Sequence, residues 1–180
     1  MVDYLSLVKK HYQIKERDLE SYSVIKKKGM NFHISGYEVK DVGYINAMGN
    51  ETLLLELYDT QLAAADLSAL NNVKSNFAHL PDHDLGTHWY DHLKLAPSLA
   101  KKGKKLSYDY QTLCNNYFLA YLSLLSSAPS CDRLAKQAKV REYTNGLLTN
   151  GGPSTDQFKK MIGDEATKDL FTRFIFSLDC

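Results

Sequence analysis

Apolar and polar positions change period along this chain, first from helical to alternating and later back to helical. In residues 2–12 the apolar side chains fall on one helical stripe, which predicts a short opening helix. The segment SYSVIKKKGMNFHISGYEV (21–39) alternates with period two and predicts two strands joined by a Lys-Gly turn. ETLLLELYD (51–59) follows a Gly-Asn turn signal and predicts a third, buried strand.

Beyond residue 60 the spacing becomes helical. Residues 62–80 predict a helix that Asp, Asn and Ser make irregular, and Pro81 and Gly86 bracket a loop after it. The clearest helical pattern covers 107–128 and ends at Pro129. Its predicted inward face consists of Tyr110, Leu113, Cys114, Phe118, Tyr121 and Leu124.

Three further helices are predicted at the C-terminal end. The first, 131–150, loses regularity at Asn145–Gly146 and ends at the loop NGGPST. Ser154 or Thr155 can cap a final helical pair, whose two members are separated by Gly163.

The order of these elements points to a fold class. Strands come first and helices later, with too few βαβ alternations for a doubly wound sheet. We therefore expect a single α+β domain over residues 1–180, a layered sandwich with a mainly antiparallel sheet. Three strands are few for this many helices, and the chain passes abruptly from a strand end to a new turn at Gly43–Tyr44. A piece of the sheet is expected to be missing at this junction.

Composition narrows the class of partner. Apolar residues make up 44% and charged residues 24% of the 180 residues, which is typical of globular domains. Lys and Arg number 22 against 21 Asp and Glu, so the net charge favours neither nucleic acid nor an anionic membrane as a partner. The basic run LAKKGKKL (99–106) contains a glycine and no aromatic residue, and we interpret it as a solvated loop that can contact an acidic protein.

The cysteines and the N-terminus indicate a compartment. Cys114, Cys131 and Cys180 are far apart and none forms a CxxC pair, which favours free thiols in a reducing cytoplasm. The N-terminal segment carries early charges and lacks the apolar core of a signal peptide. No segment approaches the roughly 20 apolar residues of a membrane span. We therefore expect a cytoplasmic protein.

Four of the six histidines lie in the stretch HLPDHDLGTHWYDH (79–92), together with the single tryptophan. If THWYDH is helical, His88 and His92 lie on one face, four residues apart, a spacing that can bind a metal ion. His79 and His83 repeat that spacing across a proline that breaks the helix. The zinc signature H-E-x-x-H is absent, because a tryptophan follows His88.

The same stretch allows two other interpretations. Histidines titrate near neutral pH, so His88 or His92 can donate a proton to a substrate or hold a carboxylate. Trp89 and Tyr90 beside them can line a pocket for a flat conjugated ligand. In the simplest interpretation, the stretch leads into a helix that covers the sheet, with Trp89 packed inward and the histidines facing water.

The C-terminal third resembles the end of a known enzyme family. REYTNGLLTNGGPSTDQFKKMIGDEATKDLFTRFIFSL (141–178) resembles the ferredoxin-dependent bilin reductases: a helix with a tyrosine, a loop with a functional Asn or Asp, then a helix and an aromatic-rich final helix. The positions that fit this order are Tyr143, Asn150, Phe158, Gly163, Ala166 and 171–178. MGNETLLLELYDTQL and YSVIKKKGMNFHISGYEV look like strands of the same family. The YDTQL and HWYD surroundings are similar to an anaerobic bacterial branch related to that fold.

The resemblance implies a fold and an activity. The fold would be a three-layer α/β/α sandwich that binds a linear tetrapyrrole between its sheet and its helices. A ferredoxin-like donor would supply electrons one at a time, and the protein would supply protons without a bound flavin or metal cofactor. In that family, strands carrying an Asp, a His and a Glu that protonate the tetrapyrrole lie at the position of the Gly43–Tyr44 junction, and this sequence lacks them.

The resemblance also suggests roles for individual residues. Asn150 matches the functional loop position and would orient the ligand or a water molecule, whereas Gly151, Gly152 and Pro153 replace the basic residue that often follows in the family. Together with the histidine stretch, this gives a predicted site with Asn150 and His88 as catalytic residues. The predicted substrate-binding residues are Trp89, His92, Arg141 and Tyr143. Two alternatives stay open: a divalent-metal enzyme built on the His and Asp residues of 79–92, and a non-catalytic protein of the same fold.

Overall fold

The computed structural model describes residues 4–27, 30–33, 36–39, 45–46, 52–60, 65–103, 108–152, 155–176 and 178. The chain divides into two compact units, one comprising Met1–Asp3 with Val42–Asp132 and the other comprising Tyr4–Asp41 with Arg133–Cys180. Both units combine helices with antiparallel strand pairs, which confirms the predicted α+β class.

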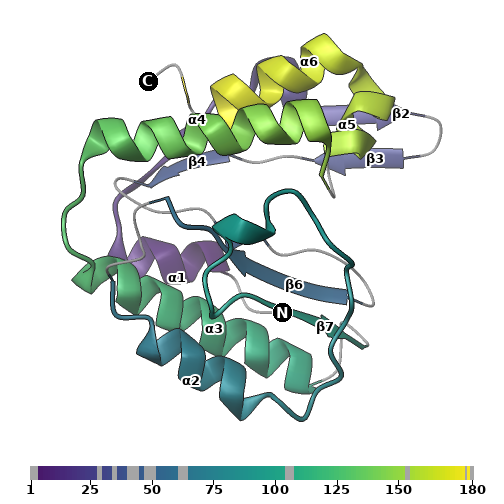
Figure 1. The fold of residues 1–180 in the computed structure, drawn as a ribbon. Coiled ribbons are helices and arrows are strands. Elements are labelled where there is room, and N and C mark those ends of the chain that lie inside the picture. The colour runs from purple at the N-terminus through teal and green to yellow at the C-terminus, as the bar shows by residue number, and fades with distance from the viewer. Residues whose placement is uncertain are drawn as a thin grey trace. The chain divides into compact units, whose positions relative to one another are not determined.

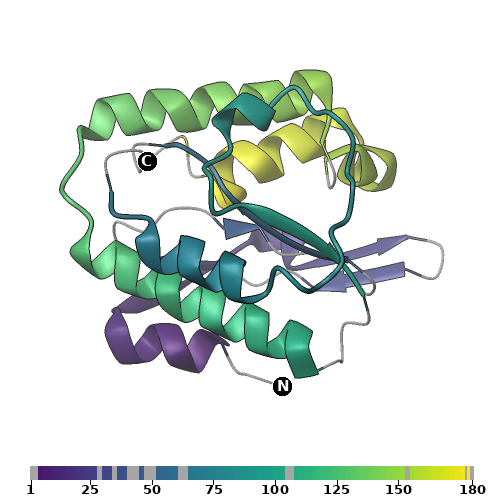
Figure 2. The same cartoon turned by 60° about the horizontal axis from the view of Figure 1, so that its bottom comes forward.

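The first unit contains a three-stranded antiparallel sheet in the order β5-β6-β7. Its strands are β5 (Ile45–Asn46), β6 (Thr52–Leu57) and β7 (Leu99–Lys102). β6 confirms the strand predicted from its run of leucines, and it pairs with β7 in a register that places Leu55 opposite Leu99. Helices α2 (Ser68–Asn76) and α3 (Tyr108–Ser127) lie along each other in both views (Figures 1 and 2).

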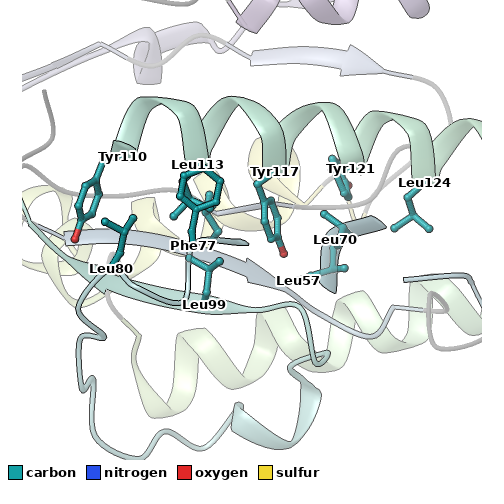
Figure 3. Packing of buried hydrophobic residues seen from close by; sticks show 11 residues of the cluster. Leu57, Leu70, Phe77, Leu80, Leu99, Tyr110, Leu113, Tyr117, Tyr121 and Leu124 are labelled. Atoms are coloured by element: carbon teal, nitrogen blue, oxygen red, sulfur yellow. The ribbon is translucent and has the colours of Figure 1, made fainter. Parts of the chain in front are cut away.

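The core of this unit lies between α3 and the sheet. Side chains along one face of α3 point toward leucines of β6 and β7 and toward the end of α2 (Figure 3). Leu57, Leu70 and Leu113 are fully buried, which removes their apolar surface from water. The predicted inward face of α3 is confirmed in part: Tyr110, Leu113, Tyr121 and Leu124 are buried, whereas Cys114 and Phe118 are only half-buried. Tyr117, which was not predicted to face inward, is fully buried.

The basic run predicted as a solvated loop begins as strand β7. Lys101, in this strand, is 4% exposed, and its ammonium donates hydrogen bonds to Leu80 O at 2.9 Å and to Asp82 Oδ1 at 2.7 Å. Pairing with β6 satisfies the backbone hydrogen bonds of β7, and the Asp82 carboxylate balances the charge of the buried Lys101 ammonium. A basic segment can therefore form a buried strand here. The prediction of a loop is therefore wrong for Leu99–Lys102.

The second unit begins with helix α1 (Tyr4–His11), which confirms the predicted opening helix. Its strands form two antiparallel pairs, one of them the predicted hairpin, in which Lys27 lies opposite Met30. The strands are β1 (Ile14–Arg17), β2 (Val24–Lys27), β3 (Met30–His33) and β4 (Gly36–Val39), with a 3-10 helix at Glu20–Ser23. The sequence did not reveal β1, and its pairing with β4 divides the second predicted strand into β3 and β4.

Helices form the C-terminal part of this unit. They are α4 (Arg133–Asn150), α5 (Thr155–Ile162) and α6 (Asp164–Asp169), and α6 continues as a π-helix at Leu170–Ile175. Gly163, with φ +87°, separates α5 from α6 as predicted. α4 runs unbroken through Asn145–Gly146, so the predicted irregularity is wrong: burial of Tyr143, Thr144 and Leu147 outweighs the helix cost of one glycine, about 1 kcal/mol.

Several predictions concern residues outside the described ranges. These are the Lys-Gly turn of the hairpin, the Gly-Asn turn signal, the Gly43–Tyr44 junction, Cys180 and the possible cap at Ser154. Of the cysteines that the structure describes, Cys114 and Cys131 are free thiols. Within the described ranges, no helix combines the length and the apolar character needed to cross a membrane.

A matched pair of substitutions on α3 tests the core. We expect Leu113→Ala to lower the free energy of unfolding by about 2–5 kcal/mol, because the side chain is fully buried and its removal leaves a cavity. Leu119→Ala, on the same helix but 46% exposed, should change it by less than about 0.5 kcal/mol. Urea unfolding measures both, and equal effects would contradict the assignment of the core face.

Candidate acid–base site

The histidine-rich stretch of the first unit folds as a turn. The Asp91 backbone N–H donates to His88 O at 3.1 Å, and Asp91 Oδ2 accepts from the His88 backbone N–H at 2.7 Å. A short 3-10 helix, Asp91–Leu93, follows, and Lys94 already has extended backbone. The helical geometry on which the metal spacing depends is therefore absent from THWYDH, and the prediction that the stretch leads into a helix covering the sheet is wrong. The Asp91 side chain binds the backbone of its own turn and so competes with a helix.

The end of this turn is attached to strand β6. Leu95 N–H donates to Leu57 O and Asp59 N–H donates to Leu93 O, both at 2.8 Å. Between these bonds, Lys94 forms an antiparallel bridge with Tyr58. The segment after the turn therefore extends the sheet locally and brings Lys94 next to the side chains at the end of β6.

A buried carboxylate lies at this point of the sheet. Glu56, on β6, is 2% exposed, and its Oε1 lies 2.6 Å from Lys94 Nζ. The Tyr58 hydroxyl donates to the other oxygen, Oε2, at 2.5 Å. A charge can be buried at a tolerable free-energy cost only with such partners, so Lys94 and Tyr58 together allow Glu56 to occupy the core.

Lys94 connects this buried carboxylate with the turn. Its Nζ also lies 2.9 Å from Asp91 Oδ1, and the same oxygen is 3.8 Å from His88 Nδ1. The side chains of His88 and Asp91 are 27% and 37% exposed, so the row of charged groups runs from the core toward solvent. One ammonium therefore contacts both carboxylates, and the His88 imidazole lies at the more exposed end of the row.

Aromatic rings surround the same groups. Tyr90, 1% exposed, stacks on the His88 ring with centroids 5.0 Å apart and an interplanar angle of 19°. Trp89 and Tyr58 meet the Tyr90 ring edge-on at 5.3 Å and 6.0 Å. Lys94 Nζ lies 5.0 Å from the Tyr90 centroid, a cation–π distance. His88 is therefore held between an apolar ring and a carboxylate.

Hydrogen bonds and charges within the site shift the pKa values of Asp91 and Lys94 in the directions that keep both side chains charged. The hydrogen bond from the His88 backbone, and next the one from Lys94, lower the pKa of Asp91. Burial by itself lowers the pKa of Lys94, but hydrogen bonds and charges from Glu56 and Asp91 outweigh burial and raise it. Burial, and second the Glu56 charge, raise the pKa of Tyr90 to about 12. At neutral pH Asp91 and Lys94 are charged and Tyr90 is neutral.

The structure brings three of the predicted site residues together in this unit. His88 lies in the centre of the group, and its Nδ1 is buried without a hydrogen-bond partner among the described residues. Trp89 is half-buried, whereas its neighbour Tyr90 occupies the core position predicted for the tryptophan. His92 is exposed, and its Nδ1 lies 2.9 Å from Trp89 O.

The other predicted site residues belong to α4 of the second unit. Tyr143 is buried, Asn150 is exposed at the last position of the helix, and Arg141 donates to Leu178 O at 3.2 Å. At about 100° per residue, Arg141 lies on the opposite side of α4 from Asn150, so these two do not form a cluster on the helix. Their roles in ligand binding stay predictions.

The metal interpretation depended on histidines gathered on one helical face, which the turn does not provide. Within the part of the chain that the structure describes, no group of three or more His, Cys, Asp or Glu side chains is arranged to hold a metal ion. All of 79–92 belongs to that part.

Three members of the site were not identified from the sequence. These are Glu56, Tyr58 and Lys94, which lie outside the histidine stretch. ETLLLELYD, which contains the first two, was predicted only as a strand. A signal was nevertheless present: a glutamate inside a run of leucines, at a position predicted to be buried, requires a cationic or hydrogen-bonding partner elsewhere in the chain. No family model matches the chain, and no curated protein matches it significantly in sequence.

We expect Tyr90→Phe to weaken the pH dependence of stability in alkaline solution. The pKa of Tyr90 is raised from 10.0 to about 12 on folding, so its stabilising contribution is complete below pH 10 and is lost as the pH rises toward 12. Phenylalanine cannot ionise, so the stability difference between wild type and variant should shrink over this range. Urea unfolding at about pH 9 and about pH 11 measures that difference. A difference independent of pH would contradict the burial of this hydroxyl.

Proposed function

We propose that this protein binds a linear tetrapyrrole or a similar conjugated ligand and reduces it with electrons from a ferredoxin-like donor. The observation that carries the proposal is the pairing of His88 with Asp91, whose Nδ1 and Oδ1 atoms lie 3.8 Å apart. A neighbouring carboxylate orients an imidazole for proton transfer. Catalytic hydrogen bonds are often long before the ligand binds and shorten in the complex.

The surroundings of His88 support a flat, electron-accepting ligand. The half-buried Trp89 ring, which meets Tyr90 edge-on, offers an aromatic surface next to the histidine on which a conjugated system can stack. The Asp91 carboxylate, 3.8 Å from His88 Nδ1, can pair with the imidazole while the ring carries the proton that it donates.

In the proposed reaction, electron and proton transfer alternate. The donor gives one electron to the conjugated system, and His88 then gives the resulting anion a proton, so no charge accumulates on the ligand. A second electron and a second proton complete a two-electron reduction. His88, 27% exposed, regains its proton from solvent after each step. The protein needs no bound flavin or metal in this scheme, and its role is to position the ligand and supply protons.

The finer features of the resemblance belong to the same proposal. We propose the family's three-layer α/β/α sandwich, which the antiparallel pairing of the strands and the packing of α2 and α3 on the sheet of the first unit support. A cytoplasmic location is supported by the free thiols of Cys114 and Cys131. We further propose that Asn150 orients the ligand or a water molecule and that His92, Arg141 and Tyr143 contribute to ligand binding.

An anaerobic absorbance titration with biliverdin tests the function directly. We expect a saturable red shift of the biliverdin band as the protein binds it, followed by bleaching when reduced ferredoxin is added. Binding without bleaching would instead support a non-catalytic protein of the same fold. A spectrum unchanged at high micromolar biliverdin would overturn the proposal.

A matched pair of histidine variants tests the proton donor. His88→Gln should slow bleaching by a factor of about 100 or more, because general-acid catalysis commonly contributes that much, while binding changes little. His79→Gln serves as the control, since His79 is exposed and its ring contacts Phe77, outside the acid–base site. Stopped-flow absorbance measures the rates, and equal rates for the two variants would exclude His88 as the donor.

A further inference from the structure

Lys94 links the buried carboxylate to the carboxylate of the turn that carries His88. Its backbone is fixed by the bridge to Tyr58, so its ammonium is presented to both carboxylates from one defined position. It lies 2.6 Å from Glu56 Oε1 and 2.9 Å from Asp91 Oδ1. Glu56 itself sits in the sheet and has its second oxygen bound by Tyr58, so Glu56 cannot follow a movement of the turn.

Asp91 is the more exposed of the two carboxylates that Lys94 contacts. Its side chain is 37% exposed, and an exposed carboxylate forms only weak, easily exchanged ion pairs unless its geometry is fixed. Here each oxygen has its own donor: Oδ2 accepts from the His88 backbone and Oδ1 faces Lys94. This division keeps Oδ1 directed at the region between Lys94 and the His88 ring.

Stability of the fold does not explain the charge at this position. Replacing a buried ion pair by apolar side chains of similar volume is often neutral or stabilising. Lys94 is 19% exposed and Glu56 is 2% exposed, so an apolar pair could fill the same space. Lys94 bridges two carboxylates, and one of them, Asp91, lies beside the His88 imidazole. The charge of Lys94 is therefore better explained by its effect on the position of Asp91 next to His88.

We propose that Lys94 is a positioning residue of the acid–base site: anchored on Glu56, it holds the Asp91 carboxylate against the His88 turn. The proposal rests on the proposed function, because it gives the proton-donating His88 a fixed carboxylate partner. It also explains how the turn is ordered without being part of a helix. The Asp91 carboxylate, held by Lys94, accepts a hydrogen bond from the His88 backbone and so fixes it.

Three variants separate this role from simple packing. Lys94→Met keeps the length of the side chain and removes its charge, Lys94→Arg restores a charge, and Asp91→Asn weakens the partner. Because K94M leaves Glu56 without its cation and can destabilise the fold, the double variant E56L/K94M removes both buried charges and keeps the core apolar. Each variant is first checked for folding by circular dichroism and urea unfolding.

The readouts are made on the ligand-free protein. We expect the carboxyl carbon-13 titration of Asp91 to show a higher pKa in K94M and E56L/K94M, because the Lys94 hydrogen bond and charge that help to lower it are lost. K94R should return it toward the wild-type value. Hydrogen exchange at the His88 amide, which donates to Asp91, should accelerate about tenfold in the same two variants.

A coupling measurement identifies the route through Asp91. If Lys94 acts through this carboxylate, the double variant K94M/D91N should exchange the His88 amide no faster than D91N alone. If the two substitutions accelerate exchange of the His88 amide additively, the proposal is overturned. It is also overturned if folded E56L/K94M keeps the wild-type pKa of Asp91 and the wild-type exchange rate of the His88 amide. In the biliverdin assay, K94M should lower kcat for bleaching with little change in KM.

The two proposals can fail separately. If biliverdin does not bind while the Asp91 and His88 readouts change as expected, the proposed function is wrong and the positioning contact stands. If biliverdin binds and is reduced but these readouts remain at their wild-type values, the positioning role is wrong and the function stands.

Discussion

The position of one lysine ammonium between two carboxylates determines how the first unit holds the turn that carries His88. Without a cation, the Glu56 carboxylate would lie in an apolar layer of leucines with no opposite charge beside it, and removing one partner of a buried ion pair costs several kcal/mol. Lys94 avoids this cost only because the chain returns to the end of β6 after the turn and pairs with it. The loop path and the buried charge therefore depend on each other.

The aromatic residues have a related role. The Tyr58 hydroxyl donates a hydrogen bond to Glu56, and the Tyr58 ring contacts Tyr90, which stacks on His88. The same side chain thus satisfies a buried oxygen and supports the packing of the histidine. Hydrogen bonding and ring packing point to one arrangement of the site, and consistency of this kind favours a single ordered state over several alternatives.

Much of the fold was predictable because apolar spacing reports burial. α1, β6, α3 and the helical pair around Gly163 followed from that spacing. The predictions that failed share another cause, because contacts between residues far apart in the sequence determined those parts of the structure. β1 and β7 are charged strands that exist because a distant strand pairs with them, and Lys101 is buried because Asp82 meets its charge. No local window of sequence contains that information.

The site shows the same division between local and distant information. His88 and Trp89 were found because histidines and a tryptophan in a short polar stretch are conspicuous. Lys94 was not found, because a single lysine near a loop end is ordinary in sequence and acquires its role only when β6 lies beside it. Asp91 entered only as one of the aspartates in the metal alternative, whereas its carboxylate is engaged by the His88 backbone and by Lys94.

The attachment of the histidine stretch at both ends has a consequence for how such a site can change over time. At its beginning, Lys101 binds Leu80 and Asp82, and at its end Lys94 binds Glu56 and Asp91. Residues 84–87 between these attachments include Gly86, whose φ of +71° favours glycine even though an added side chain would meet nothing within 4 Å. Most of this segment is exposed, so it can be lengthened, or can change side chains at positions other than Gly86, without loosening either attachment. For the proposed function, this means that ligand preference could diversify in that interval while the geometry around His88 is inherited unchanged.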